Sequence, residues 1–96
     1  MATNFRIAAS RNGETLHLKL MGDFDGISAH ELLDTLKKRV VHASRIFLDT
    51  NNLKDIYPFG LNVFYTNLHT LKDRSVELIF TGENASKFEM FKNMSS

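Results

Sequence analysis

Acidic side chains follow two apolar segments of this sequence, and they are the residues best suited to chemistry. Asp23 and Asp25 come soon after the run that ends at Leu20, and Asp49 closes a second run. Ligands of open α/β sheets collect outside the carboxyl ends of parallel strands. Clustered carboxylates are also the ligands that Mg²⁺ prefers. One hypothesis is therefore a small-ligand or Mg²⁺-dependent phosphoryl site at this acidic rim. The alternative is that the same carboxylates only complement helix N-termini.

Other residue types offer little for catalysis. Ser28 precedes Glu31 by three positions, the spacing of a capping box in which hydroxyl and carboxylate bind backbone N–H groups. The four histidines are scattered, and no two of them are four positions apart. The chain has no Cys, which excludes disulfides, thiolate metal sites and a Cys nucleophile. We therefore expect no catalytic residue, no metal and no other cofactor.

Length and composition predict one domain spanning residues 1–96. Of the 96 residues, 43% are hydrophobic, which is enough for a single core. The net charge is +1, with 12 basic and 11 acidic residues, so no global field favours nucleic acid. No apolar run approaches the roughly 18 residues of a membrane span, and the N-terminus lacks the apolar centre of a secretion signal. We expect a cytoplasmic protein that does not insert into a membrane.

The first half of the chain predicts a hairpin followed by a helix. Residues 4–9 and 16–20 alternate between apolar and polar positions on either side of Asn12-Gly13, a strong hairpin signal. The alternation indicates one buried and one solvated face. The capping box at Ser28 opens an apolar stripe at helical spacing, which predicts a helix over residues 28–42. Residues 22–26 between hairpin and helix are expected to be a loop.

The second half predicts two strand–helix units. Residues 45–50 form a strand whose apolar centre does not alternate, which favours a parallel strand buried on both faces. A loop over residues 50–59 leads to a helix beginning at Pro58 or Phe59, since Pro suits the first helical position. Residues 76–80 form another strand, and Asn84 caps a last helix. The order ββαβαβα defines an α/β fold with a mixed sheet, and we expect the helices mainly on one face.

Four segments in this order resemble the STAS domain, the anti-sigma-factor-antagonist family. Gly22-Asp23-Phe24-Asp25 is similar to its GELD-like signature, and Arg45–Asp49 to its v-x-L-D strand. Leu53–Leu61 falls on the segment v-x-x-I-D-S-S-G-L, and Val76–Gly82 on L-x-L-x-G. The resemblance covers about residues 14 to 91. It implies a single STAS-like domain that acts through protein–protein interaction and has no catalysis of its own.

The chain departs from this family pattern at the position that the family phosphorylates. Tyr57 takes the place of the Asp, Pro58 that of the phosphoacceptor Ser, and Phe59 that of the second Ser. Pro58 is therefore a degenerate phosphoacceptor position, and the usual serine switch is absent there. Other residues, namely Thr50, Ser28 or Tyr57, are left as alternatives for modification. The chain also ends before the family's usual final strand and helix, which would leave a sheet edge open for pairing.

The resemblance implies a docking surface made of residues 22–26, residues 50–59 and the start of the second helix. The residues expected to bind a partner are Asp23, Asp25, Asn51, Asn52, Asp55, Tyr57, Pro58, Phe59 and Asn62. The aromatic side chains would be the anchors, although Phe59 could instead pack into the core. By resemblance, the partner is an anti-sigma factor or serine-kinase-like protein, another STAS protein, or the transporter subunit served by a stand-alone STAS accessory protein. Homodimerisation is a further alternative.

Overall fold

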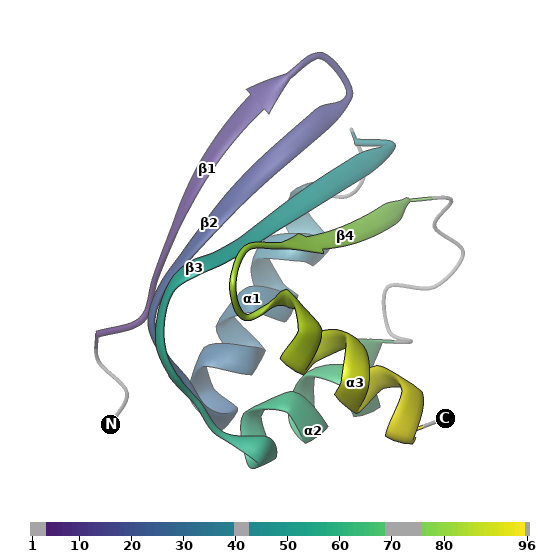
Figure 1. Cartoon of the computed structure of the whole chain (residues 1–96). Coiled ribbons are helices and arrows are strands. Elements are labelled where there is room, and N and C mark those ends of the chain that lie inside the picture. The colour runs from purple at the N-terminus through teal and green to yellow at the C-terminus, as the bar shows by residue number, and fades with distance from the viewer. Residues whose placement is uncertain (1–3, 40–42, 69–75, 96) are drawn as a thin grey trace.

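The computed structural model describes residues 4–39, 43–68 and 76–95, and these form one mixed sheet with three helices. The strands are β1 (Arg6–Asn12), β2 (Thr15–Phe24), β3 (Arg45–Ile56) and β4 (Glu77–Thr81). The helices are α1 (Gly26–Arg39), α2 (Pro58–Asn67) and α3 (Ala85–Ser95). The spatial order is β1-β2-β3-β4, antiparallel between β1 and β2 and parallel elsewhere. All three helices cover the same face of the sheet (Figure 1), so the predicted fold class is confirmed.

The hairpin of β1 and β2 forms at the predicted turn. Gly13 has a φ of 66°, a conformation that glycine adopts without strain, and Asn12 pairs with Thr15 across the turn. On β2, Leu16, Leu18 and Leu20 are at most 1% exposed, whereas the side chains between them are exposed. The hairpin therefore has one buried and one solvated face, as the alternation predicts.

β3 is longer than the sequence predicts and is buried on one face only. It runs on to Ile56, and its second half pairs with the end of β2, Asn52 opposite Met21 and Ile56 opposite Phe24. The prediction of loops over residues 22–26 and 50–59 is thus wrong for most of both stretches. The polar residues of this second half have low strand propensity, so the sequence does not predict a strand there. They are part of β3 because they pair with β2, with two register shifts along the ladder.

The centre of β3 shows why burial on both faces was the wrong inference. Ile46 and Leu48 are fully buried beneath the helices, but Phe47 lies on the opposite face of the sheet, which no described helix covers (Figure 1). Phe47 is half-buried because its ring stacks on that of His17 from β2, with centroids 5.1 Å apart. Phe47 is therefore partly covered by the side chain of His17, and no second layer of helices is needed to explain the apolar run of residues 46–48.

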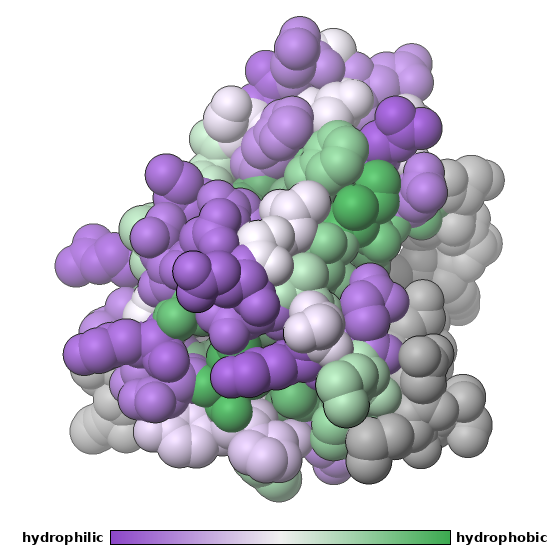
Figure 2. Space-filling view, in the orientation of Figure 1, coloured by the Kyte–Doolittle hydropathy of each residue, from purple (hydrophilic) through white to green (hydrophobic). Residues whose placement is uncertain are grey.

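Three phenylalanines join the sheet to two helices. Phe24 of β2 lies edge-to-face against Phe64 of α2 and Phe88 of α3, with ring centroids 6.3 and 5.2 Å apart. All three side chains are fully buried. Because Phe24 is the last residue of β2, this cluster also fixes where α2 begins relative to that strand. Figure 2 shows hydrophilic residues over the upper and left parts of the molecule and hydrophobic ones mainly in the region of β4 and below it.

The start of α1 differs from the predicted capping box. The helix begins at Gly26, and the cap is Asp25, whose Oδ1 accepts hydrogen bonds from the Ser28 N–H at 2.9 Å and the Ser28 hydroxyl at 3.0 Å. The Ser28 hydroxyl also donates to the carbonyl oxygen of Asp23 at 2.7 Å. Asp25 is the N-cap residue in place of Ser28 because β2 continues to Phe24 and α1 begins at Gly26, so only Asp25 lies between strand and helix. The expected end of this helix, residues 40–42, lies outside the described residues.

The other two helix starts are partly as predicted. α2 begins at Pro58, after an extended Tyr57 whose side chain makes no capping hydrogen bond. Asn84, expected as a cap for α3, instead donates from Nδ2 to the carbonyl oxygen of Thr50 at 3.0 Å. That contact fastens the β4–α3 turn to the middle of β3. No helix in the described part of the chain is both long and apolar enough to cross a lipid bilayer.

Candidate functional site

The candidate site lies where the ends of β2 and β3 pass into the first turns of α1 and α2, at the lower end of the molecule in Figure 1. The Tyr57 N–H donates to the carbonyl oxygen of Phe24 at 2.9 Å, which ties the entrance of α2 to the end of β2. Gly60 brings the backbones together: a Cβ on it would lie 2.8 Å from the carbonyl oxygens of Phe24 and Asp25. The backbones are therefore in close contact at this junction, and only glycine fits there.

Three large apolar side chains stand exposed at this junction. Ile27 of α1 is 58% exposed, Tyr57 is 46% exposed, and Phe59 of α2 is 69% exposed. We call these three residues the apolar corner. Phe59 does not pack into the core; its ring lies against Gly26, where an added Cβ would come within 2.8 Å of it. A shallow groove of about 330 Å³ is lined by Asp25, Gly26, Ile27, His30, Phe59 and Val63.

The acidic residues beside the apolar corner support the turn between β2 and α1. The two hydrogen bonds from Ser28, the one from its backbone N–H first, hold the pKa of Asp25 below its usual value because they favour the carboxylate. The backbone N–H of Asp23 donates to Oδ1 of Asn4 at 3.2 Å. Asp25 therefore caps α1, as the helix-end alternative expects, whereas Asp23 acts through its backbone and its buried Oδ1 accepts no hydrogen bond from the described residues.

The three carboxylates of the proposed acidic rim do not share one location. Asp49 is paired in register with Lys19, which precedes Asp23 by four residues on β2, on the order of 13 Å along a strand. Among the described residues, no three His, Asp or Glu side chains come close enough to hold a metal ion.

The predicted partner-binding residues divide between two regions. Tyr57 and Phe59 belong to the apolar corner, and Asp25 and Pro58 lie beside it. Asn51, in contrast, lies roughly 16 Å before Ile56 along β3. The Asn51 side chain accepts a hydrogen bond from the Glu83 N–H at 2.8 Å and so belongs to the β4 side of the sheet. The other predicted polar residues are exposed on β3 and α2: Asn52, Asp55 and Asn62.

Sequence reasoning missed Ile27, His30 and Val63. A signal for Ile27 was present, because it falls outside the buried stripe of α1, formed by Ala29, Leu32, Leu33 and Leu36. A large aliphatic residue at the start of a helix that does not share the spacing of the buried residues is expected to be exposed. The other two residues become part of the groove only because α1 and α2 lie side by side.

Two of the three hydroxyls considered for modification are buried. Ser28 and Thr50 are both 0% exposed. The Thr50 hydroxyl donates to the carbonyl oxygen of Thr81 at 2.7 Å and accepts from the Asn84 N–H at 3.1 Å. Of these three side chains, Tyr57 alone is exposed, at 46%.

Comparison of the structure with solved structures identifies the fold. It matches the anti-sigma-factor antagonist SpoIIAA in its unphosphorylated form with a TM-score of 0.66 and 13% identity, over 92% of this chain and 81% of that one. It matches an anti-sigma-factor antagonist STAS domain from Rhodobacter sphaeroides with a TM-score of 0.66 and 13% identity, over 92% and 98%. The chain therefore has the STAS fold of the anti-sigma-factor antagonists.

The same fold occurs inside a much larger protein. A structure of Mglu matches with a TM-score of 0.67 and 19% identity over 79% of this chain, which spans only 19% of the Mglu chain. No protein-family model matches the sequence, and no curated protein does either. Fold similarity at such low identity describes architecture, so function has to be argued from the site.

Proposed function

We propose that this domain is a protein-interaction module without catalytic activity, and that it docks a regulatory protein through the apolar corner. The observation that carries the proposal is the exposure of Ile27, Tyr57 and Phe59 at a junction that close backbone contacts hold together. Large exposed apolar side chains grouped together on a folded domain are typical of an interaction site. Aromatic anchors contribute most of the energy of protein interfaces.

The arrangement suits docking because little order has to be gained on binding. Pro58 restricts the backbone between the two aromatic residues, and Gly60 seats the helix against β2. Anchors that are already ordered lose less conformational entropy when a partner covers them. Asp25 lines the groove together with Ile27 and Phe59, and the exposed Asp55 precedes Tyr57 by two residues. These two carboxylates would form a polar rim that favours a partner with basic residues around an apolar pocket.

The fold similarity supports the partner classes that the sequence indicates. The solved structures with this fold include anti-sigma-factor antagonists, one of them in a phosphorylated form. We propose an anti-sigma factor or kinase-like protein as the first candidate partner, with another STAS protein and a transporter subunit as alternatives. Because Pro58 has no hydroxyl, docking here would be independent of serine phosphorylation at that position.

The proposal is tested by comparing one captured partner across matched variants. The wild-type domain is used to isolate a partner, and its Kd is then measured with the double variant Tyr57→Ala/Phe59→Ala. We expect at least a hundredfold weaker binding, since two anchors of about 1.5 kcal/mol or more each are removed. Met90→Ala on α3 is the control, because Met90 is 62% exposed but belongs to a different element.

Circular dichroism establishes that all variants fold alike. Equal affinity of the folded double variant and the wild type would refute the assignment of the apolar corner. Loss of binding in Met90→Ala alone would instead move the docking surface to α3.

A further inference from the structure

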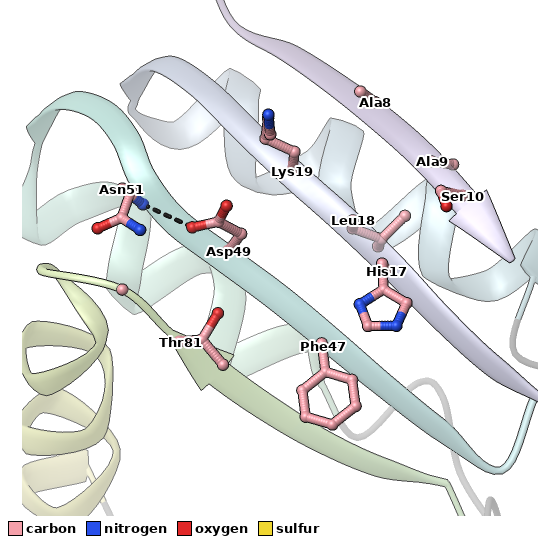
Figure 3. Close-up of a pocket in the computed structure, with 11 residues that line it drawn as sticks. Ala8, Ala9, Ser10, His17, Leu18, Lys19, Phe47, Asp49, Asn51 and Thr81 are labelled. Atoms are coloured by element: carbon pink, nitrogen blue, oxygen red, sulfur yellow. Dashed lines mark hydrogen bonds between the residues drawn. The ribbon is translucent and has the colours of Figure 1, made fainter. Parts of the chain in front are cut away.

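The face of the sheet that the helices leave uncovered contains a second hollow, separate from the apolar corner. Its volume is about 590 Å³, and it crosses all four strands. Figure 3 shows its residues standing on β1, β2, β3 and β4. They are Ala8, Ala9, Ser10, His17, Leu18, Lys19, Phe47, Asp49, Asn51, Thr81 and Gly82. We call this hollow the sheet groove.

Small side chains on β1 and aromatic rings on the central strands give the sheet groove its shape. Ala8 and Ser10 stand opposite Lys19 and His17 in the β1–β2 register, so the β1 side is low. The rings of His17 and Phe47 are nearly parallel, with planes 14° apart. Both rings line the sheet groove and are seen almost face-on in Figure 3, one offset from the other, so their aromatic surface is that of an offset stack. A further planar ring can extend such a stack.

Two opposite charges stand next to this aromatic surface without neutralising each other. Lys19 and Asp49 are register partners on neighbouring parallel strands. Nevertheless, Lys19 makes no ion pair or hydrogen bond with Asp49 or with any other residue in the described ranges. The Oδ1 atom of Asp49 accepts the Asn51 N–H at 3.0 Å, drawn as a dashed line in Figure 3. That bond orients the carboxylate, and no described residue donates to Oδ2.

The spacing of rings and charges specifies the kind of ligand. Lys19 and Asp49 each lie two residues beyond the ring on their own strand, which is about 7 Å. In an aromatic amino acid, the distance from the ring to the charged groups on the α-carbon is of this size. A phosphate or a simple aromatic anion would be repelled by the carboxylate of Asp49, and a simple cation would be repelled by the ammonium group of Lys19. A zwitterion meets both charges at once.

We propose that the sheet groove binds an aromatic α-amino acid. The ligand's carboxylate pairs with Lys19, its ammonium group donates to Oδ2 of Asp49, and its ring stacks on the His17–Phe47 surface. This binding site is separate from the apolar corner, because the side chains that would hold the ligand lie on the opposite side of the sheet from α1 and α2.

The test is a titration of the ¹⁵N-labelled domain with L-tryptophan, followed by amide chemical shifts. Three relatives of the ligand separate its parts: glycine lacks the ring, tryptamine the carboxylate, and 3-indolepropionate the ammonium group. We expect saturable shifts at the amides of Lys19, Phe47, Asp49 and Thr81 with L-tryptophan. Tryptamine and 3-indolepropionate should bind about tenfold more weakly, the loss of one charge-assisted contact. Glycine should give no localised shift at the same concentrations.

Matched variants show whether the named side chains hold the ligand. Lys19→Met and Asp49→Asn should each weaken L-tryptophan binding about tenfold, whereas Lys54→Met and Asp55→Asn, exposed elsewhere on β3, should not. Unchanged affinity in both groove variants would overturn the proposal. Equal affinity for indole and L-tryptophan would also overturn it, because the groove would then be only an apolar surface. Absence of localised shifts up to the solubility of L-tryptophan would remove the site.

Discussion

Replacing Gly60 by Ala tests whether the seat of α2 on β2 builds the candidate site. A Cβ at this position would lie 2.8 Å from three backbone atoms, the carbonyl oxygen of Phe24 and the carbonyl carbon and oxygen of Asp25. Real Cβ atoms essentially never come this close, and backbone atoms in a strand end and a helix cap have little room to yield. The helix would therefore have to move away from the strand.

Two effects of opposite sign determine how much Gly60→Ala changes the free energy of unfolding. Alanine is favoured over glycine inside a helix by about 1 kcal/mol. Overpacking against a rigid neighbour costs about 1 to 3 kcal/mol, and here all three contacts are with backbone. We take the upper end of that range, so Gly60→Ala should lower the free energy of unfolding by about 2 kcal/mol. For a domain of this size, that corresponds to a fall in Tm of roughly 8 to 16 °C.

Urea denaturation followed by far-ultraviolet circular dichroism measures this difference directly. Asn62→Ala is the matched control, since Asn62 is exposed on the same helix and should change stability by less than about 0.5 kcal/mol. If Gly60→Ala proved as stable as Asn62→Ala, the close approach of α2 to β2 would not exist as described. The inference that this close contact supports the apolar corner would then be refuted.

Three further outcomes follow from the contacts described above. The folded-state pKa of Asp25 is lowered, so its stabilisation is present above the ordinary value of about 4 and is lost as the pH falls through the folded value. The stability difference between wild type and Asp25→Asn, from urea midpoints, should therefore shrink from pH 6 toward pH 3; a constant difference would contradict this. Burial raises the pKa of Tyr65 and keeps its phenol protonated, and the phenol donates to the carbonyl oxygen of Phe88 at 2.9 Å. Tyr65→Phe should thus cost about 1 kcal/mol in the same assay, and a neutral effect would argue against that bond. Phe88→Ala should cost about 3 to 5 kcal/mol because Phe88 is fully buried, whereas the exposed Met90→Ala should change little; similar losses in both would contradict the core assignment.

Features with a local physical cause were predictable from the sequence. The hairpin was predictable because Asn12-Gly13 favours the turn and the leucines of β2 alternate. The start of α2 was predictable because Pro58 has no N–H to lose at the first helical position. The STAS-like order of segments was also visible in the sequence, and the solved structures with the same fold confirm it.

Features that depend on a second segment were not predictable. The sequence predicted the cap of α1 at Ser28, but β2 extends to Phe24 and the cap is Asp25. The polar residues after Thr50 have low strand propensity, so only pairing with β2 places them in β3. Phe47 looked like a core residue because a sequence does not show which face of a sheet remains uncovered.

The functional residues divide in the same way. The sequence by itself determined that an aromatic, proline-containing segment without a serine stands at the start of α2, because residue types and spacing are local information. Only the tertiary structure decided that Phe59 is exposed beside Ile27, and that Lys19 stands next to Asp49 without pairing to it. Exposure and charge pairing depend on which distant segments pack together: the packing of α1 beside α2 for Phe59, and the parallel register of β2 and β3 for Lys19 and Asp49.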